Sequence, residues 1–176
     1  MALFLERGFD AVTVDDIARA AAISRRGFFD YFPAKEDVVQ AWQDAFGEAL
    51  AAEVAARPEG EPMARVVEEA MVSAISASAT PLAFALDQLI SSTRSLAASA
   101  HLKYARLEQT LAAALAARPG GRGDLGERFL AMAAVGALRL GADRWRADAT
   151  PENAEVKARE VAREMWSASR SLGDEA

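Results

Sequence analysis

Ser24, Arg25 and Arg26 stand side by side in a chain of 176 residues that holds a single histidine and no cysteine. An arginine guanidinium offers a planar fork of N–H donors that matches phosphate oxygens and the paired acceptors on a guanine edge. A serine hydroxyl both donates and accepts hydrogen bonds. These groups are suited to binding and not to breaking covalent bonds. The two adjacent cations beside a hydroxyl therefore predict recognition of a polyanion.

Residues suited to catalysis or metal binding are scarce. His101 is the single histidine, and we find no serine-elbow glycines, no His/Asp/Glu metal cluster and no Gly-rich phosphate loop. The lack of cysteine excludes disulfides and thiolate metal sites. The adjacent carboxylates Asp15-Asp16 and Glu36-Asp37 fall at predicted helix starts, where capping explains them. We therefore expect neither enzyme activity nor a cofactor.

Two short predicted helices position the serine and the arginines. Thr13 and Asp16 have the spacing of a capping box, so the first helix is predicted over about 14–21. Ser24 caps a second helix, which Pro33 ends. This is the layout of a helix-turn-helix, in which the second helix lies in the DNA major groove and its first residues meet the bases.

The rest of the chain shows helical periodicity and no strand signal, which predicts an all-α fold. We expect a three-helix helix-turn-helix domain over 1–47 and a helical ligand-binding and dimerisation domain over 48–176. Eight of the thirteen aromatic residues fall in 1–47, which favours a small, separate aromatic core there. Helices are predicted to start near Lys35, at Thr80-Pro81, after a capping box of Asp124 and Glu127, and at Thr150-Pro151. Between helices, the sequence predicts a linker at 57–62, a break at 91–95 and a loop at 118–123.

The charge balance is unusual for a DNA-binding protein. The net charge is −6, and 1–47 carries five cationic and eight acidic side chains, a net −3. We therefore expect weak binding to non-specific DNA. The apolar runs are short and interrupted, and Met1–Phe9 lacks the features of a signal peptide. These features predict a cytoplasmic protein with no membrane partner.

Leu3-Phe4, Gly8-Phe9, the stretch TVDDIARAAAISRR from Thr13 to Arg26 and the stretch FDYFPAKEDVV from Phe29 to Val39 resemble the DNA-binding domain of the TetR family of repressors. The resemblance covers about 1–47. It implies a homodimer that binds a palindromic double-stranded operator and is released from it by a small-molecule effector.

The resemblance also assigns DNA contacts. Arg25 and Arg26 would contact base edges, and Val14 and Phe29 would touch base edges or thymine methyls. The hydroxyl and ammonium groups of the remaining residues would bind phosphates. The assigned positions are Thr13, Val14, Ser24, Arg25, Arg26, Gly27, Phe29, Tyr31 and Lys35.

Several departures from the family pattern bear on DNA affinity. Ala22 stands where the family has a turn glycine, and a positive φ there would cost about 1 kcal/mol. Gly27 replaces a usual threonine, and Asp30 places a negative charge on the second helix. The first helix also begins late, since family members carry a further turn or two and a basic arm before Leu3. Residues of that kind preceding Met1 would offset part of the charge deficit.

Polar residues set among apolar stripes are the candidates for a ligand pocket, and the mostly apolar surroundings predict an apolar or amphipathic effector. Each candidate has an alternative as ordinary core or solvated surface. His101 could orient a ligand together with Tyr104 or be exposed beside Lys103, and Asp87 could pair with Arg94. The candidates are Met71, Ile75, Phe84, Gln88, Thr93, His101, Tyr104 and Met132.

The last two predicted helices are the candidates for dimerisation, because small residues on them permit close helix approach. The alternative is that these faces pack only within one chain. The candidates are Phe129, Ala133, Gly136, Ala137, Leu140, Val161, Met165 and Trp166. At the level of function, the alternatives are a helical bundle with no DNA role, an activator, and a ligand-binding dimer of the same fold with weak or lost DNA binding.

Overall fold

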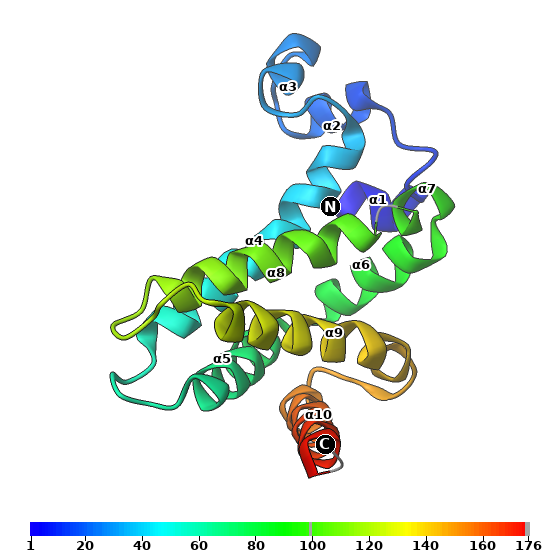
Figure 1. Ribbon diagram of the computed structural model, residues 1–176. Coiled ribbons are helices and arrows are strands. Elements are labelled where there is room, and N and C mark those ends of the chain that lie inside the picture. Colours follow the sequence, from blue (N-terminus) through cyan, green and yellow to red (C-terminus); the bar gives the residue numbers. More distant parts are fainter. Residues whose placement is uncertain (99, 175–176) are drawn as a thin grey trace.

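The computed structural model describes residues 1–98 and 100–174, and every regular element in that part is an α-helix, as predicted (Figure 1). The helices are α1 (Ala2–Arg7), α2 (Val14–Ala20), α3 (Arg25–Tyr31), α4 (Lys35–Ala56), α5 (Met63–Ser78), α6 (Pro81–Ser92), α7 (Arg94–Ala97), α8 (Ala100–Ala116), α9 (Leu125–Asp148) and α10 (Ala154–Asp174).

The predicted caps of α2 and α3 are confirmed. The Thr13 hydroxyl accepts from the Asp16 amide at 3.2 Å, and the Asp16 carboxylate accepts from the Thr13 amide at 3.0 Å. The Ser24 hydroxyl accepts from the Gly27 amide at 2.9 Å. The turn between the helices holds Ala22 at φ 56°, the one described non-glycine residue with a positive φ. The turn therefore has the left-handed conformation that glycine adopts most easily.

The aromatic residues of the N-terminal segment do not form a separate core, and that prediction was wrong. Phe4 and Phe9 are buried against each other, with ring centroids 5.0 Å apart. They share one apolar cluster with Val39 of α4, Ile90 of α6 and Leu96 of α7. The six-residue α1 is too short to bury its apolar face alone, so it packs beside α6 (Figure 1).

A single long helix joins the two predicted domains. α4 begins at Lys35 and runs unbroken past Gly47 to Ala56, where the predicted linker starts. Beyond α3 the main core is built from α4, α5, α8 and α9, with Leu50, Val67, Leu111 and Leu115 among its buried members. The α2–α3 pair lies at one end of the molecule and α10 at the other (Figure 1).

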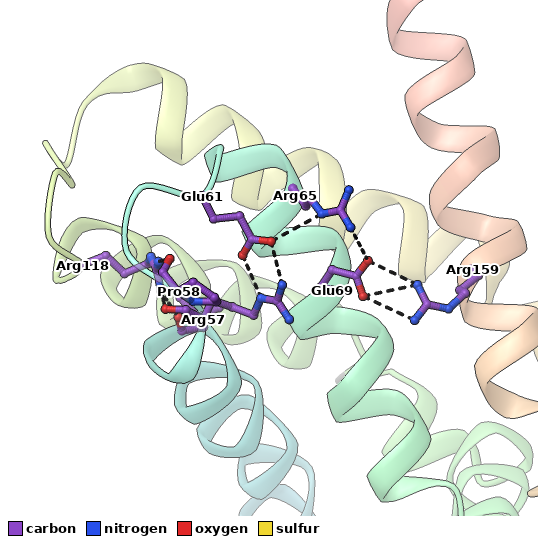
Figure 2. A network of polar contacts seen from close by, with 8 residues as sticks. Arg57, Pro58, Glu61, Arg65, Glu69, Arg118 and Arg159 are labelled. Carbon is purple, nitrogen blue, oxygen red and sulfur yellow. Dashed lines mark hydrogen bonds and ion pairs between the residues drawn. The ribbon is translucent and has the colours of Figure 1, made fainter.

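A polar network fastens the far end of α4 to its neighbours (Figure 2). The buried Arg118 guanidinium donates to the carbonyl oxygens of Val54, Arg57 and Pro58, the last at 2.7 Å. Ion pairs then run along the surface of α5 from Arg57 through Glu61, Arg65 and Glu69 to Arg159 of α10. The Arg57 hydrogen bond is the main cause that lowers the pKa of the Glu61 carboxyl. The network holds α4, α5 and α10 in fixed relation at this end.

One predicted capping box and one predicted helix start need correction, although α9 begins after Asp124 as predicted. The Asp124 carboxylate accepts from the Glu127 amide as predicted, but the Glu127 carboxylate accepts from Arg122 and Gly123 of the preceding loop. α10 begins at Ala154 and not at Pro151. Its start is delayed because the Asn153 side chain accepts from the Thr150 amide and donates to the Asp148 carbonyl, which holds 150–153 as a turn.

Within the described residues, no individual helix has both the length and the apolar composition needed to cross a membrane. Only α5 and α6 taken together would meet that requirement, and their axes bend by 97° where they join.

Candidate functional site

The outward face of α3 presents aromatic and cationic side chains together. Phe28 is buried beneath the helix, whereas Arg25 and Arg26 are exposed. Phe29 is 45% exposed and Tyr31 is 75% exposed, although both side chains are large and partly apolar. Packing within the chain does not account for these two rings, so this face is suited to a partner.

Arg25 is held in place by neighbours on the same face. Its Nη1 donates to both carboxylate oxygens of Asp15, at 3.1 and 3.0 Å, and its guanidinium lies 5.7 Å from the centre of the Phe29 ring. Arg26 makes no ion pair with any residue that the structure describes. One guanidinium is thus shared with a carboxylate, and the other is free to bind an anion or a base edge.

The other residues assigned to DNA contact lie close to this face, but several have roles within the fold. The hydroxyls of Thr13 and Ser24 serve the helix caps, and the Thr13 hydroxyl also donates to Asp16 at 2.6 Å. Val14 is half-buried at the start of α2. A Cβ on Gly27 would lie 3.3 Å from the Ser24 hydroxyl oxygen, so a larger residue would crowd the cap.

Lys35 lies at the start of α4 and is directed toward the chain itself. Its Nζ donates to the carbonyl oxygens of Phe9 at 2.9 Å, Val12 at 3.1 Å and Asp10 at 3.4 Å. The ammonium also lies 4.4 Å from the centre of the Phe9 ring. These contacts fasten the loop between α1 and α2, which accounts for Lys35 without a phosphate contact.

Several acidic residues behind the negative charge of 1–47 are used within the fold. Asp16 pairs with Arg19 at 3.2 Å, and the hydrogen bond from Thr13 is the largest cause that lowers its pKa. Asp37 accepts from the Ala34 amide at 2.7 Å, and Asp44 pairs with Arg106 of α8 at 2.8 Å. Of these contacts, only the Asp44–Arg106 pair adds a cation from outside 1–47, so the segment keeps an excess of negative charge.

A second candidate site is a partly open cavity of about 420 Å³ lined by α4, α5, α6, α8, α9 and α10. Four of the predicted ligand residues line it: Met71, Ile75, Phe84 and Tyr104. Aromatic rings supply much of the wall, because Trp42 and Phe46 line it from α4 and Trp145 lines it from α9. The rings of Phe84 and Trp145 are stacked, 5.7 Å apart and 12° from parallel.

The other four predicted ligand residues lie outside this cavity. Gln88 lines an outer hollow between α6 and the loop before α10, and this hollow shares Phe84, Asp87 and Arg146 with the cavity wall. The Thr93 hydroxyl donates to the Leu89 carbonyl at 2.7 Å, and His101 is exposed. Met132 lies 48% exposed on α9. Helical periodicity alone did not separate the inward from the outward positions.

The charged groups of the cavity wall were not among the predicted ligand residues. Lys103, considered only as a neighbour of His101, lines the wall beside Tyr104. Burial lowers the pKa of the Lys103 ammonium and raises the pKa of the Tyr104 hydroxyl. Asp87, expected to pair with Arg94, instead pairs with Arg146 of α9 at 3.4 Å. That partner lies 59 positions away along the chain, and no local signal points to it.

Some of the predicted dimer residues are exposed, some are partly buried, and some line the cavity. Phe129 and Leu140 are exposed at 57% and 80%, and a Cβ on the intervening Gly136 would meet nothing within 4 Å. Ala133 is half-buried on the same helix, and the Trp166 indole N–H is buried with no hydrogen bond to any described residue. The remaining three, Ala137, Val161 and Met165, line the cavity.

The two candidate sites are connected through α6. Phe84 and Asp87 of this helix line the cavity, while Leu89 and Ile90 pack in the cluster that holds α1. Trp42 of α4 belongs to both groups. Two packed helices, α4 and α6, thus connect the cavity wall with the apolar cluster that holds α1. In the described part of the chain, no three His, Cys, Asp or Glu side chains are grouped so as to hold a metal ion.

Comparisons with known proteins agree with the sequence resemblance. Residues 1–42 match the family of bacterial regulatory proteins described as the tetR family. The HTH-type transcriptional regulator TcmR of Streptomyces glaucescens is 41% identical over 59 residues, which are 34% of this chain and 26% of TcmR. The match thus spans about a quarter of that relative. The crystal structure of PfmR, a TetR family transcriptional regulator from Thermus thermophilus, aligns with a TM-score of 0.48 at 20% identity, over 93% of this chain and 89% of PfmR.

Proposed function

We propose that this chain, whose first 42 residues match the tetR family of bacterial regulatory proteins, is a ligand-responsive repressor that acts on DNA in the cytoplasm as a homodimer. The observation that carries the proposal is the face of α3, where Arg25, Arg26, Phe29 and Tyr31 are exposed together although two of them are large aromatic residues. That face lies on the second helix of a helix-turn-helix, the element that enters the major groove.

In this proposal Arg26 and Arg25 donate to guanine edges, and the Phe29 ring contacts a thymine methyl or a base edge. Arg25 exchanges its Asp15 partner for DNA on binding. A two-fold dimer would place two copies of α3 in successive major grooves about 34–36 Å apart, so the operator is a palindrome.

The dimer surface that we propose is the outer face of α9. Leu125, Phe129, Met132, Gly136 and Leu140 follow steps of three or four residues, and the four large members are exposed. A stripe of that kind would be buried in a helix–helix contact between two copies, and Gly136 lets the backbones approach closely.

The cavity is the proposed effector site. A ligand that packs against Phe84 and Asp87 would favour one position of α6, and α6 carries the apolar contacts of α1. The two recognition helices would then no longer match successive grooves. The coupling is reciprocal, so bound operator must weaken ligand binding by the factor by which ligand weakens operator binding.

One further function is favoured by specific residues. Asp15 occupies Arg25, Gly27 lacks a side chain for phosphate, and Asp30 is exposed on α3. These features favour a ligand-binding dimer of the same fold whose DNA binding is weak or lost.

Selection from a random double-stranded DNA library with the purified protein separates the two functions. The repressor proposal predicts enrichment of one palindromic sequence whose half-sites are one helical turn apart. Absence of enrichment at low salt, with a folded dimer, would instead support the ligand-binding dimer. Including a competitor of random-sequence DNA at several salt concentrations separates specific from charge-driven binding.

A further inference from the structure

The wall of the effector cavity is mostly apolar but also holds the polar residues Gln43, Ser78 and Thr80. Most of its charge lies where α6, α8 and α9 meet. Three charged residues lie there: Asp87 of α6, Lys103 of α8 and Arg146 of α9. The remaining charged residue of the wall, Glu68 of α5, is not among the groups whose charge acts on Lys103. The charge inside this part of the cavity is therefore set by three side chains.

Two of these charges compensate each other. Asp87 and Arg146 form an ion pair at 3.4 Å, and Arg146 also pairs with the exposed Asp143 at 2.6 Å. Lys103 has no hydrogen bond or ion pair with any described residue, and its contact is with the Tyr104 ring, whose centre lies 5.4 Å from Nζ. Lys103 therefore has no anion within hydrogen-bond or ion-pair distance among the described residues, although Asp87, which is bound to Arg146, acts on its charge from farther away.

Such a charge is unfavourable in an apolar wall unless something else stabilises it. Removing an ammonium from water disfavours its charged form, and burial is the main cause that lowers the pKa of Lys103. An uncharged methionine or leucine would fill the same space without that cost. A ligand carrying a negative charge would supply the missing partner.

We propose that the effector is an amphipathic carboxylate, whose carboxylate binds the Lys103 ammonium and whose apolar body packs against Trp42, Phe84 and Trp145. This inference rests on the proposed effector cavity and specifies the class of molecule that it takes. The ion pair would form away from bulk water, where a charge-assisted hydrogen bond contributes more than on the surface.

Decanoate and 1-decanol are suitable probes, because they share an apolar chain and differ at the head group. Binding is measured at neutral pH, below micelle-forming concentrations, by calorimetry and by the tryptophan fluorescence of Trp42 and Trp145. We expect decanoate to bind at least about tenfold more tightly than 1-decanol. Decylamine, which carries the opposite charge, is expected to bind more weakly than either.

Three lysine variants identify the residue responsible. Lys103→Met should remove the preference for decanoate over 1-decanol, and Lys103→Arg, which keeps the charge, should retain part of it. Lys157→Met removes a lysine that pairs with Glu160 on α10 outside the cavity, so it should leave both affinities unchanged. Because Lys103→Met removes a desolvated charge, its thermal midpoint should be equal to or above that of the parent protein. An unchanged or raised thermal midpoint shows that weaker binding by this variant does not result from unfolding.

The outcomes separate this inference from the proposed effector site. Equal affinities for decanoate and 1-decanol, or a preference that survives in Lys103→Met, would overturn the carboxylate inference and leave the cavity as a ligand site. If none of the three probes binds, both the cavity proposal and the inference fail.

Discussion

At the residue scale, Ala22 is a residue type that its backbone conformation disfavours. It occupies the left-handed region at φ 56° in the turn between α2 and α3. A side chain at that φ costs about 1–2 kcal/mol, whereas glycine reaches it without strain. Its neighbour Ile23 is 40% exposed, so the strain is not offset by burial of the turn.

Ala22→Gly should therefore stabilise the protein by about 0.5–1 kcal/mol, since the relieved strain exceeds the added freedom of glycine in the unfolded chain. Urea unfolding followed by circular dichroism measures the change. Ala52→Gly, at an exposed position inside α4, is the matched control and should destabilise by about the same amount. A destabilised Ala22→Gly would show that the turn differs from the one described here.

The residues that the sequence predicted best are those whose roles are local. The caps by Thr13, Ser24 and Thr80 involve partners three residues away, and all three are present. Lys35 was assigned to DNA by resemblance, but its ammonium is used by carbonyls more than twenty positions earlier in the chain. A role that depends on such a distant partner leaves no trace in spacing.

At the element scale, the helices and most of their boundaries follow from local signals, but their neighbours do not. The packing of α1 places Phe4 in one apolar cluster with Ile90 of α6 and Leu96 of α7, and nothing in the pattern of these segments specifies that they meet. The cavity likewise could not be predicted from local patterns, because six helices contribute to its wall. Four ligand candidates were placed on it, yet Lys103 became visible only when burial was known.

The proposed dimer surface on α9 gives a prediction at this scale. Phe129→Glu and Leu140→Glu place charges within the proposed contact, and each should raise the dimer dissociation constant at least about thirtyfold. Analytical ultracentrifugation measures the constant, and circular dichroism checks that the helices remain.

Leu102→Glu provides the comparison, because Leu102 is similarly exposed but lies on α8. It should leave the dimer unchanged. If neither α9 variant weakens self-association, or if the α8 variant weakens it equally, the α9 stripe is not the contact between copies.

At the scale of the whole molecule, α4 and α6 both line the cavity and pack in the apolar cluster that holds α1, so they link the two proposed sites. α4 continues from the helix-turn-helix into the cavity wall through Trp42, and α6 contacts the cavity on one side and α1 on the other. The far end of α4 is fixed by Arg118 and the ion pairs that lead to α10. Movement produced by a ligand would therefore be directed toward α1 and not toward the fixed end.

The central claim is that the α3 face contacts operator DNA, and fluorescence anisotropy with a labelled, selected operator tests it most directly. The parent protein is compared with Arg25→Ala/Arg26→Ala and with Arg94→Ala/Arg122→Ala, which removes the same charge elsewhere. We expect the α3 variant to raise the operator dissociation constant about a hundredfold, toward the value for random DNA, because each guanine contact contributes about 1–3 kcal/mol. The control should change it little. An α3 variant that binds the operator as tightly as the parent protein would contradict the account.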